Sequence, residues 1–436
     1  MRIAIIGKFP PIQGGVSRLT YQTAHELARR GCDVLVLTNA GQTEYAYRQM
    51  FMDDDAERLA MTYAGGGSVT VFNTDPVIQY AYIPWAQPFA TELYGLGLDV
   101  LDSEVDLIVG WYFEPYGITA AHLAREFGIP LVLIHAGSDI SRLARHPNLR
   151  AAYTHAASRA GRILTMPVAK SLLEKLQVKE ELCQTPLTSQ IPTEFFRRGQ
   201  AMDLPSIVNR AEDWFARMSL SNRAQSTLQQ GMKLGRQLKD RVPIIGTYNK
   251  VSASKGSYDM LPVLEALAEE SYDFYLCTLS GSKPAEFECY LEALGSYPRL
   301  SRRTVTLPFV APWRVPEFLT MCDYVLFLER DFDVPIHSSG IPREVLASGA
   351  VLVCSGQAAD HGQYESILTA GTNYIRVPDP KDHAAFKVVL RQALEQQVSA
   401  ERIGEKGRIA AARMNAGAVE DGFADAIMTA IENLQA

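Results

Sequence analysis

Two lysines in the second half of the chain have the type and spacing needed to bind a diphosphate. Lys250 and Lys255 stand five residues apart in the run T-Y-N-K-V-S-A-S-K-G-S, directly after a strand-like segment, 242–246. Two ammonium groups near the start of a helix can neutralise a departing pyrophosphate, where negative charge develops as the bond to it breaks. Two lysines in a polar loop usually face only solvent, so it is their position after a strand that favours a phosphate site.

A glutamate and a short helix start offer a second group for the same ligand. Residues 340–353 read G-I-P-R-E-V-L-A-S-G-A-V-L-V, which predicts a loop, a short helix opened by Gly340 and Pro342, and a strand over 351–353. Unpaired N–H groups at a helix start can hold a phosphate, and Glu344 one turn further in would face the same ligand. This suits a sugar nucleotide, although the helix dipole alone also explains a glutamate in a first turn.

Strand ends in the first half carry residues that could contact a sugar or an acceptor. His135 directly follows the apolar run 131–134, and the segment W-Y-F-E-P-Y-G with Tyr112 and Glu114 follows the strand-like run 106–110. Aromatic rings can stack on a sugar, but a loop packed over a sheet edge explains them as well. A histidine at a strand end is likewise often a hydrogen-bonded structural residue.

The elements that must position these residues alternate between strands and helices. The chain opens with a strand at 3–7, a loop with Gly14 and Gly15, a helix at 19–30 and a strand at 33–38. Ligands of open α/β sheets bind beyond the carboxyl ends of the strands, so the two glycines sit where backbone would approach a ligand. A G-G pair alone more often marks a flexible turn.

The second half repeats this alternation. Its strand-like runs lie at 242–246, 274–279, 304–307, 324–327 and 351–353. Strands alternating with helices predict parallel sheets, so the fold class is α/β with two Rossmann-like β/α/β domains facing a cleft.

Length and composition bound the protein's class. A chain of 436 residues is too long for one ordinary core and predicts two domains, and its 47% hydrophobic content is that of a globular protein. The sequence contains no run of about 20 apolar residues, which is the length that a membrane-spanning helix needs. The six cysteines form no C-x-x-C pair, which favours a reducing cytoplasm over disulfides or zinc. The net charge of −7 gives no support to nucleic-acid binding.

Four segments together resemble the retaining glycosyltransferases of family 4, which have the GT-B fold. The run E-V-L-A-S-G-A-V-L-V is similar to that family's E-A-M-A-C-G-x-P-V-V, and the loop with Lys250 and Lys255 resembles its G-R-L-x-x-x-K-G. The opening P-P-I-Q-G-G-V is similar to P-x-x-G-G-V, and H-A-G-S-D-I after the strand 131–134 resembles H-G-x-D.

The resemblance implies a role for each site residue. Glu344 would bind the ribose hydroxyls, Lys250 and Lys255 would grip the diphosphate, and His135 would lie beside the donor sugar. Backbone amides of the preceding loop would hold the phosphates, and the turns after two strands would border the base. The donor-binding set is Gly14, Gly15, Gly281, Val310, His337, Ser338, Ser339, Gly340, Ile341, Pro342 and Glu344, and the acceptor-side set is Tyr112, Glu114 and Asp139.

The chain departs from the family pattern at three points. The family has a second glutamate eight residues upstream of the one matching Glu344, and here that position is Ile336. Lys250 stands where the family has an arginine. An ammonium group cannot bind phosphate through the two parallel hydrogen bonds of a guanidinium, so a weaker or differently oriented phosphate contact is expected. The loop before Glu344 is also longer, so the donor-sugar contacts of the absent glutamate are in question.

The predicted domains are 1–195, a connecting insert at 196–241, a donor-binding domain at 242–415, and a terminal helix at 416–436 that crosses back to the first domain. The segment 41–76 reads as a surface excursion with an acidic cluster. The insert has nine Lys or Arg against four Asp or Glu, with aromatic residues between them. Such a segment can lie on a membrane surface or bind an anionic acceptor, and it is also explained as a solvated helix capping the hinge.

The sequence therefore predicts a retaining transferase that moves a sugar from a nucleotide-sugar donor, with UDP as the expected nucleotide, to a hydroxyl acceptor in glycan, glycolipid or glycoconjugate synthesis. No metal cofactor is expected, since the D-x-D of Asp331 and Asp333 is a common tripeptide. Nucleic acid is not an expected partner. The expected place is the cytoplasm, with contact to the inner membrane through 196–241 as a further option. A sugar-nucleotide epimerase of the same fold and a non-catalytic nucleotide-sugar-binding or partner subunit are the alternatives.

Overall fold

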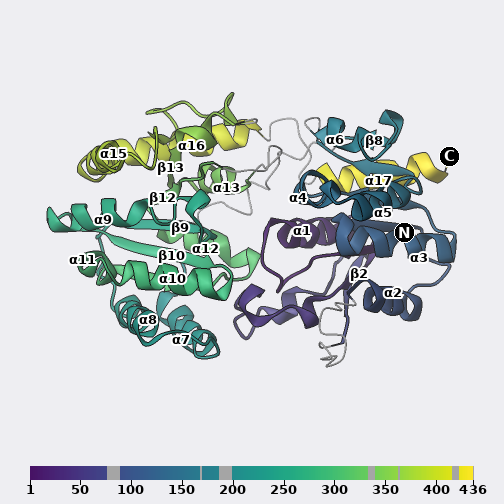
Figure 1. The fold of residues 1–436 in the computed structure, drawn as a ribbon, viewed down its shortest axis with the longest axis horizontal. Helices are drawn as coiled ribbons and strands as arrows, with labels where there is room; N and C mark the ends of the chain where they lie inside the picture. The colour runs from purple at the N-terminus through teal and green to yellow at the C-terminus, as the bar shows by residue number, and fades with distance from the viewer. Residues whose placement is uncertain are drawn as a thin grey trace.

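The protein folds into two α/β domains that lie side by side (Figure 1). The computed structural model describes residues 1–436 except 76–88, 167–168, 186–198, 332–338, 362–363, 415–421 and 436. Each domain is built on one sheet whose apolar strands are covered by helices on both faces, as expected for a parallel sheet. The predicted fold class is confirmed.

The first domain contains an eight-stranded sheet in the order β3-β4-β2-β1-β5-β6-β7-β8, in which only β3 is antiparallel to its neighbour. The strands are β1 (Arg2–Gly7), β2 (Asp33–Thr38), β3 (Met61–Thr62), β4 (Ser68–Asn73), β5 (Leu107–Trp111), β6 (Leu131–Ile134), β7 (Arg162–Leu164) and β8 (Cys183–Gln184). Its helices are α1 (Gly15–Arg29), α2 (Phe89–Val100), α3 (Ile118–Phe127), α4 (Ser138–Ser141), α5 (Pro147–Ala157) and α6 (Lys170–Glu174), with short turns at η1 (Ala40–Gln42), η2 (Tyr45–Tyr47), η3 (Ala56–Arg58), η4 (Phe113–Gly117), η5 (Leu143–Arg145) and η7 (Glu180–Leu182).

The second domain contains a parallel six-stranded sheet in the order β11-β10-β9-β12-β13-β14. The strands are β9 (Ile244–Lys250), β10 (Tyr275–Gly281), β11 (Thr304–Leu307), β12 (Tyr324–Phe327), β13 (Val351–Ser355) and β14 (Ile375–Val377). Its helices are α7 (Leu204–Phe215), α8 (Asn222–Gly235), α9 (Met260–Glu269), α10 (Pro284–Leu294), α11 (Pro298–Ser301), α12 (Val315–Met321), α13 (Ile341–Ser348), α14 (Gly356–Ala359), α15 (His383–Glu395) and α16 (Gln397–Met414), with turns at η8 (Ala253–Lys255) and η9 (Pro312–Arg314).

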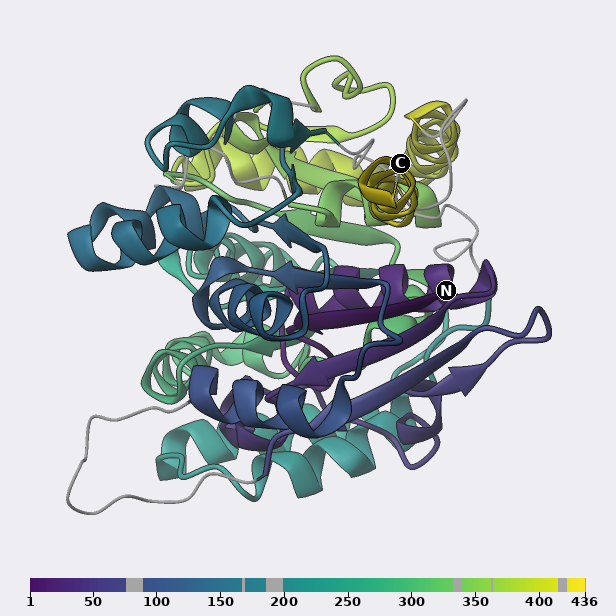
Figure 2. The same ribbon diagram turned by 90° about the vertical axis from the view of Figure 1, so that its right-hand side faces the viewer.

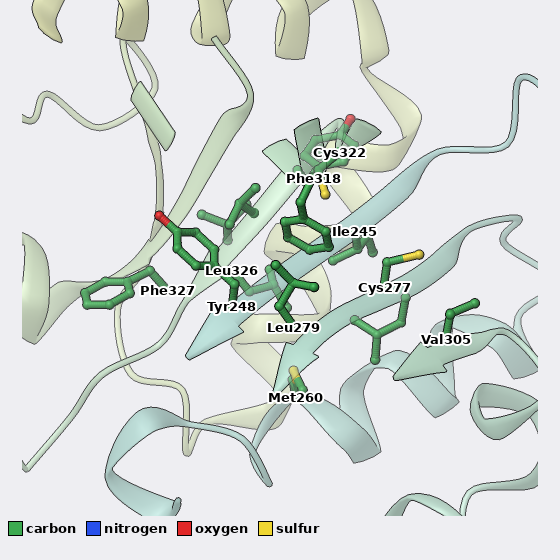
Figure 3. Close-up of a cluster of buried hydrophobic side chains, with 14 of the residues drawn as sticks. Ile245, Tyr248, Met260, Cys277, Leu279, Val305, Phe318, Cys322, Leu326 and Phe327 are labelled. Carbon is green, nitrogen blue, oxygen red and sulfur yellow. The ribbon is translucent and has the colours of Figure 1, made fainter. Parts of the chain in front are cut away.

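The core of the second domain positions one polar group. Figure 3 shows Tyr248 of β9 among apolar side chains that include Leu279, Phe318 and Leu326. These side chains are almost fully buried and hold the tyrosine ring in place. Its hydroxyl leaves the apolar cluster and donates a hydrogen bond to Glu344.

The basic insert belongs to the second domain. Helices α7 and α8 pack on one another, and α8 covers the edge strand β11, so that Val208, Ala211 and Met232 are buried in the same core as the sheet. Gly231 lies so close to β11 that a Cβ atom there would come within 2.8 Å of the Thr304 carbonyl oxygen. The apolar face of these helices is therefore occupied by the core of the second domain, and membrane contact through this segment stays a prediction.

The terminal helix α17 (Gly422–Gln435) packs on the first domain although it follows the second in sequence (Figure 2). Ile427 and Ile431 share a core with Ile3 and Ile5 of β1. Arg30 after α1 forms an ion pair of 2.6 Å with Asp425. No described helix is long and apolar enough to cross a membrane.

The segment 41–76 is not the surface excursion that its acidic and glycine-rich composition predicts. Residues 68–73 form β4, which pairs in parallel with β2 inside the sheet. Met50 and Asp55 each have an exposed fraction of 0% because the second domain covers them. The prediction failed because the groups that bury this segment lie more than 250 residues further along the chain.

Candidate active site

Three side chains of the first domain gather at the carboxyl ends of neighbouring strands. Lys8, Tyr112 and His135 directly follow β1, β5 and β6, which lie side by side in the sheet. The Lys8 Nζ atom lies 4.7 Å from the centre of the Tyr112 ring, within the range of a cation–π contact. The Tyr112 hydroxyl lies 2.9 Å from the Ser138 Oγ atom. This edge therefore presents a cation, an aromatic ring and an imidazole together.

His135 is held with one ring nitrogen occupied and the other without a partner. The Thr165 hydroxyl donates to the Met166 carbonyl at 3.3 Å and lies 2.7 Å from the His135 Nε2 atom, so Nε2 carries the proton and donates to it. Among the described residues no group bonds to Nδ1, which is then a buried acceptor. Burial lowers the pKa of His135, which keeps the ring neutral. A neutral imidazole with a spare lone pair can accept a hydrogen bond from a sugar hydroxyl.

Asp139, predicted on the acceptor side, is a structural residue. Its exposed fraction is 0%, and its carboxylate accepts N–H bonds from Phe113, Ala136 and Ile140 at 3.0 to 3.3 Å. These bonds tie the loop after β5 to the loop after β6, and they use the lone pairs that a ligand would need. Asp139 therefore positions Tyr112 and His135 and does not itself contact an acceptor.

Tyr112 and Glu114, predicted on the acceptor side, follow the carboxyl end of β5. Tyr112 has φ of 81°, a conformation that costs energy in a residue other than glycine and that often occurs at functional sites. Glu114 is half-buried, and burial raises the pKa of its carboxyl.

The lysine pair of the second domain lies at the carboxyl end of the central strand. Lys250 is the last residue of β9 and pairs in register with Gly281, the last residue of β10. Lys255 follows in η8, with 15% of its side chain exposed, and forms an ion pair with Glu329, whose side chain is 7% exposed. Of the two cations, Lys250 is the more open to a ligand. Burial and the neighbouring Lys250 lower the pKa of Lys255 to about 7, while the Glu329 carboxylate is the group that favours its charged form.

Glu344 lies in the first turn of α13, where the sequence places it, and it is 3% exposed. It accepts a hydrogen bond from Tyr248 of its own domain and forms an ion pair with Arg18 of α1 in the first domain. Burial lowers the pKa of Arg18 to about 10, and the nearby Arg343 contributes. Glu344, which was predicted to bind the ribose, is thus a buried carboxylate that side chains of both domains contact.

The structure describes only part of the loop that precedes α13. His337 and Ser338, predicted to hold phosphate, lie outside the described residues, as do Ile336 and Asp333. The Ser339 carbonyl accepts a hydrogen bond from Tyr364. Gly340 is the N-cap of α13, where a Cβ atom would lie 2.7 Å from the Arg18 guanidinium. Ile341 and the buried Pro342 form the first turn.

The glycine loop of the first domain faces the second domain's strand ends. Gly14 has φ of 119° and caps α1, and a Cβ atom at Gly14 or Gly15 would meet nothing within 4 Å. The neighbouring Gln13 side chain approaches Gly281, where a Cβ atom would lie 3.3 Å from its Nε2 atom. The two glycines therefore leave space where the two sheet edges meet.

Val310, predicted beside the nucleotide base, has another role in this structure. It is 3% exposed, and its backbone forms a bridge with Met50, whose N–H donates to the Phe309 carbonyl at 2.6 Å. Val310 thus belongs to the contact between the domains.

Sequence reasoning missed four groups at this junction: Lys8, Arg18, Tyr248 and Glu329. Lys8 directly follows the first strand, so the rule that ligands lie beyond strand ends could have found it. The other three are recognisable only from their partners across the structure.

A prediction on pH follows from the lysines. Desolvation lowers the pKa of Lys8, Lys250 and Lys255, and for Lys255 to about 7. An anion binds the protonated ammonium, so each group that is neutral in the free protein must take up a proton on binding, and the affinity for UDP should fall as the pH rises from about 7 to about 9. Calorimetric titration with UDP across that range would measure it. The slope should flatten in Lys255→Met, and a pH-independent affinity in the wild type would contradict the prediction.

No metal site is evident in the part of the chain that the structure describes, since no three His, Cys, Asp or Glu side chains gather there. Asp331 of the D-x-D tripeptide is engaged by Lys381 at 2.6 Å and by Arg330 at 3.1 Å.

The architecture, with two parallel-sheet domains whose strand ends carry a buried glutamate, lysines and a neutral histidine at their junction, defines a protein of the GT-B class. Residues 13–180 match the family model described as Glycosyltransferase Family 4. This match covers less than half of the chain, and the solved structures described next share the two-domain GT-B fold.

Solved structures share this fold along the whole chain. Sucrose-phosphate synthase from Thermosynechococcus elongatus is 14% identical, with a TM-score of 0.62 and coverage of 100% of this chain and 98% of that chain. The Anabaena protein HepE in complex with UDP-glucose is 15% identical, with a TM-score of 0.61 and coverage of 100% and 99%. WaaG, a glycosyltransferase involved in lipopolysaccharide biosynthesis, is 15% identical, with a TM-score of 0.55 and coverage of 94% and 95%. No curated protein matches the sequence.

Proposed function

We propose that this protein is a retaining glycosyltransferase that moves a sugar from a UDP-sugar to a hydroxyl acceptor. The observation that carries the proposal is the buried Glu344 in the first turn of α13, with Lys250 at the end of β9 and Lys255 after it in the same domain. A carboxylate can bind ribose hydroxyls through charged hydrogen bonds, and the ammonium groups can neutralise the diphosphate. UDP is supported by HepE, whose solved complexes hold UDP and UDP-glucose.

The mechanism assigns each group a part in one displacement. Lys250 and Lys255 would stabilise the charge on the departing diphosphate as the bond between the sugar carbon and the phosphate oxygen breaks. The acceptor hydroxyl would form its bond on the face that the phosphate leaves, and its proton would pass to the departing phosphate oxygen. The His135 Nδ1 atom would accept a hydrogen bond from a hydroxyl of the donor sugar and fix its orientation.

The acceptor side and the compartment belong to the same proposal. Tyr112 and Glu114, at the carboxyl edge of the first domain, would contact a saccharide, lipid-linked or small-molecule hydroxyl.

No metal cofactor is required, because ammonium groups neutralise the phosphates. The six cysteines are free thiols, which supports the reducing cytoplasm expected from their spacing.

The experiment that tests the donor site is a thermal-unfolding scan with UDP, GDP and ADP. At about a hundredfold excess over the dissociation constant, binding adds about 2.7 kcal/mol of stability, or about 5 to 10 degrees in Tm for domains of this size. We expect a shift with UDP that Lys255→Ala reduces. As a matched control, Lys406→Met removes an exposed lysine on α16 and should keep the full shift.

Product analysis separates the transferase from its alternatives. Release of UDP from a UDP-sugar together with a new glycoside on an added acceptor is the expected result. An epimerase would convert the donor without releasing UDP. Binding without any turnover across a panel of acceptors would favour a non-catalytic sugar-nucleotide-binding protein, and no shift with any nucleotide would contradict the donor site itself.

A further inference from the structure

The donor site of the second domain is short of positive charge. Lys255 forms an ion pair with the buried Glu329, which offsets part of its positive charge, and Lys250 at the end of β9 is the more exposed of the two cations. In a sugar nucleotide each of the two phosphoryl groups carries a negative charge. Burying such a diphosphate against one ammonium group would leave an uncompensated charge, which is costly in a desolvated site. A further cation is therefore needed close to Lys250.

The first domain supplies an ammonium group at this place. Lys8 follows β1, half-buried over the Tyr112 ring, and it begins the loop whose Gln13 approaches Gly281, the register partner of Lys250. Within the described ranges no ion pair forms on Lys8. Two like charges held near each other by separate domains repel, and an anion between them removes that repulsion.

Asp139 is the acidic group whose charge acts on Lys8, and it is not a salt-bridge partner. Its oxygens already accept the N–H groups of Phe113, Ala136 and Ile140. The Tyr112 ring contacts the Lys8 ammonium through a cation–π interaction and carries no formal charge that would neutralise it. The side chain of Lys8 therefore keeps its hydrogen-bond donors for a ligand.

We propose that Lys8 is a diphosphate ligand contributed by the first domain, so that both domains hold the phosphates of the donor. The inference rests on the proposed function, because it names a further contact in the same donor site. Lys8 from the first domain and Lys250 from the second would both contact the diphosphate, near the place where Gln13 approaches Gly281. As the bond to the sugar breaks, both ammonium groups would stabilise the charge that collects on the departing phosphate oxygen.

A series of ligands tests this contact against the wild type. Lys8→Met should weaken the binding of UDP and of inorganic pyrophosphate about tenfold to a hundredfold, the worth of a charged hydrogen bond. The binding of uridine, which has no phosphate, should not change. Lys8→Arg keeps the charge and should retain most of the affinity. Lys406→Met, an exposed lysine on another helix, is the matched control and should bind all three ligands as the wild type does.

Three results would overturn the inference. Unchanged UDP and pyrophosphate affinity in Lys8→Met, with a raised KM for the acceptor, would assign Lys8 to the acceptor. An equal loss for uridine would show general damage to the site. If the wild type bound neither nucleotide nor pyrophosphate, the proposed diphosphate site itself would be ruled out. Should Lys8→Met fail to fold, Lys8→Gln is the second variant, with the same expectation.

The failure of the proposed donor can be told apart from the failure of this inference. If the wild type binds pyrophosphate but no nucleotide, and Lys8→Met loses the pyrophosphate, the role of Lys8 stands while the UDP-sugar does not. If UDP binds and depends on Lys255 but not on Lys8, the donor stands and the inference fails.

Discussion

Replacing Glu344 with alanine is expected to weaken the binding of UDP by about 1.5 to 3 kcal/mol, or about tenfold to 150-fold. The side chain is buried in the first turn of α13, and its carboxylate can accept hydrogen bonds from both ribose hydroxyls. Alanine removes these charged hydrogen bonds and leaves the hydroxyls unpaired in a desolvated site. Calorimetric titration with UDP and with inorganic pyrophosphate measures the effect, and only UDP should lose affinity.

The ion pair between Arg18 and Glu344 requires a control, because Glu344→Ala also removes the carboxylate that pairs with the Arg18 guanidinium. The comparison is therefore repeated in an Arg18→Met background. A loss caused by the ribose contact persists when Arg18→Met/Glu344→Ala is compared with Arg18→Met alone. Glu344→Gln keeps an acceptor oxygen and should lose less than alanine. Wild-type affinity for UDP in Glu344→Ala would refute the assignment of Glu344 to the donor site.

Local chemistry explains why part of this site is readable in the sequence. Gly340 and Pro342 start a helix, Gly349 in the left-handed conformation ends it, and the next strand is a β-branched run, so the loop, helix and strand are fixed by residues within one short segment. Glu344 was predicted for the same reason. His135 was placed correctly after β6 because that strand is a purely apolar run. The strand before Lys250 was predicted to end at residue 246, whereas β9 continues through the polar residues to Lys250.

Contacts between the domains could not be predicted in this way. The Arg18 partner of Glu344 and the Trp313 partner of Asp55 lie hundreds of residues away in sequence. Charged residues are almost never fully buried unless they are paired, so Asp53 to Asp55 alone indicate a solvated surface. Only the fold shows that the second domain brings an arginine to them.

The junction between the domains depends on Asp55, and replacing it with alanine is expected to destabilise the protein by about 3 kcal/mol. The carboxylate is fully buried and accepts hydrogen bonds from the Trp313 indole at 2.5 Å, from Arg314 at 2.8 Å and from the Met52 N–H at 2.8 Å. Removing one partner of a buried pair costs about 3 to 5 kcal/mol. The lower end applies because Arg314 keeps Asp54 and Glu317 as neighbours.

Asp53→Ala is the matched control, because it removes a carboxylate two residues away that is 99% exposed and 3.7 Å from Arg210. Exposed pairs contribute at most about 1 kcal/mol. Thermal unfolding should therefore show a loss of about 6 to 12 degrees in Tm for Asp55→Ala, and little change for Asp53→Ala. Equal, small losses in both variants would contradict a buried junction at Asp55.

The same variant also tests whether the domains must be held together for the donor to bind. Arg18 and the loop with Gln13 reach the second domain from the first, and Asp55 is one of the contacts that fix this arrangement. Asp55→Ala should therefore weaken UDP binding at a temperature at which both domains are still folded, although Asp55 is assigned no contact with the ligand. If UDP affinity is unchanged while stability falls, the second domain binds the nucleotide alone, and the part of the first domain is confined to the acceptor and the transfer step.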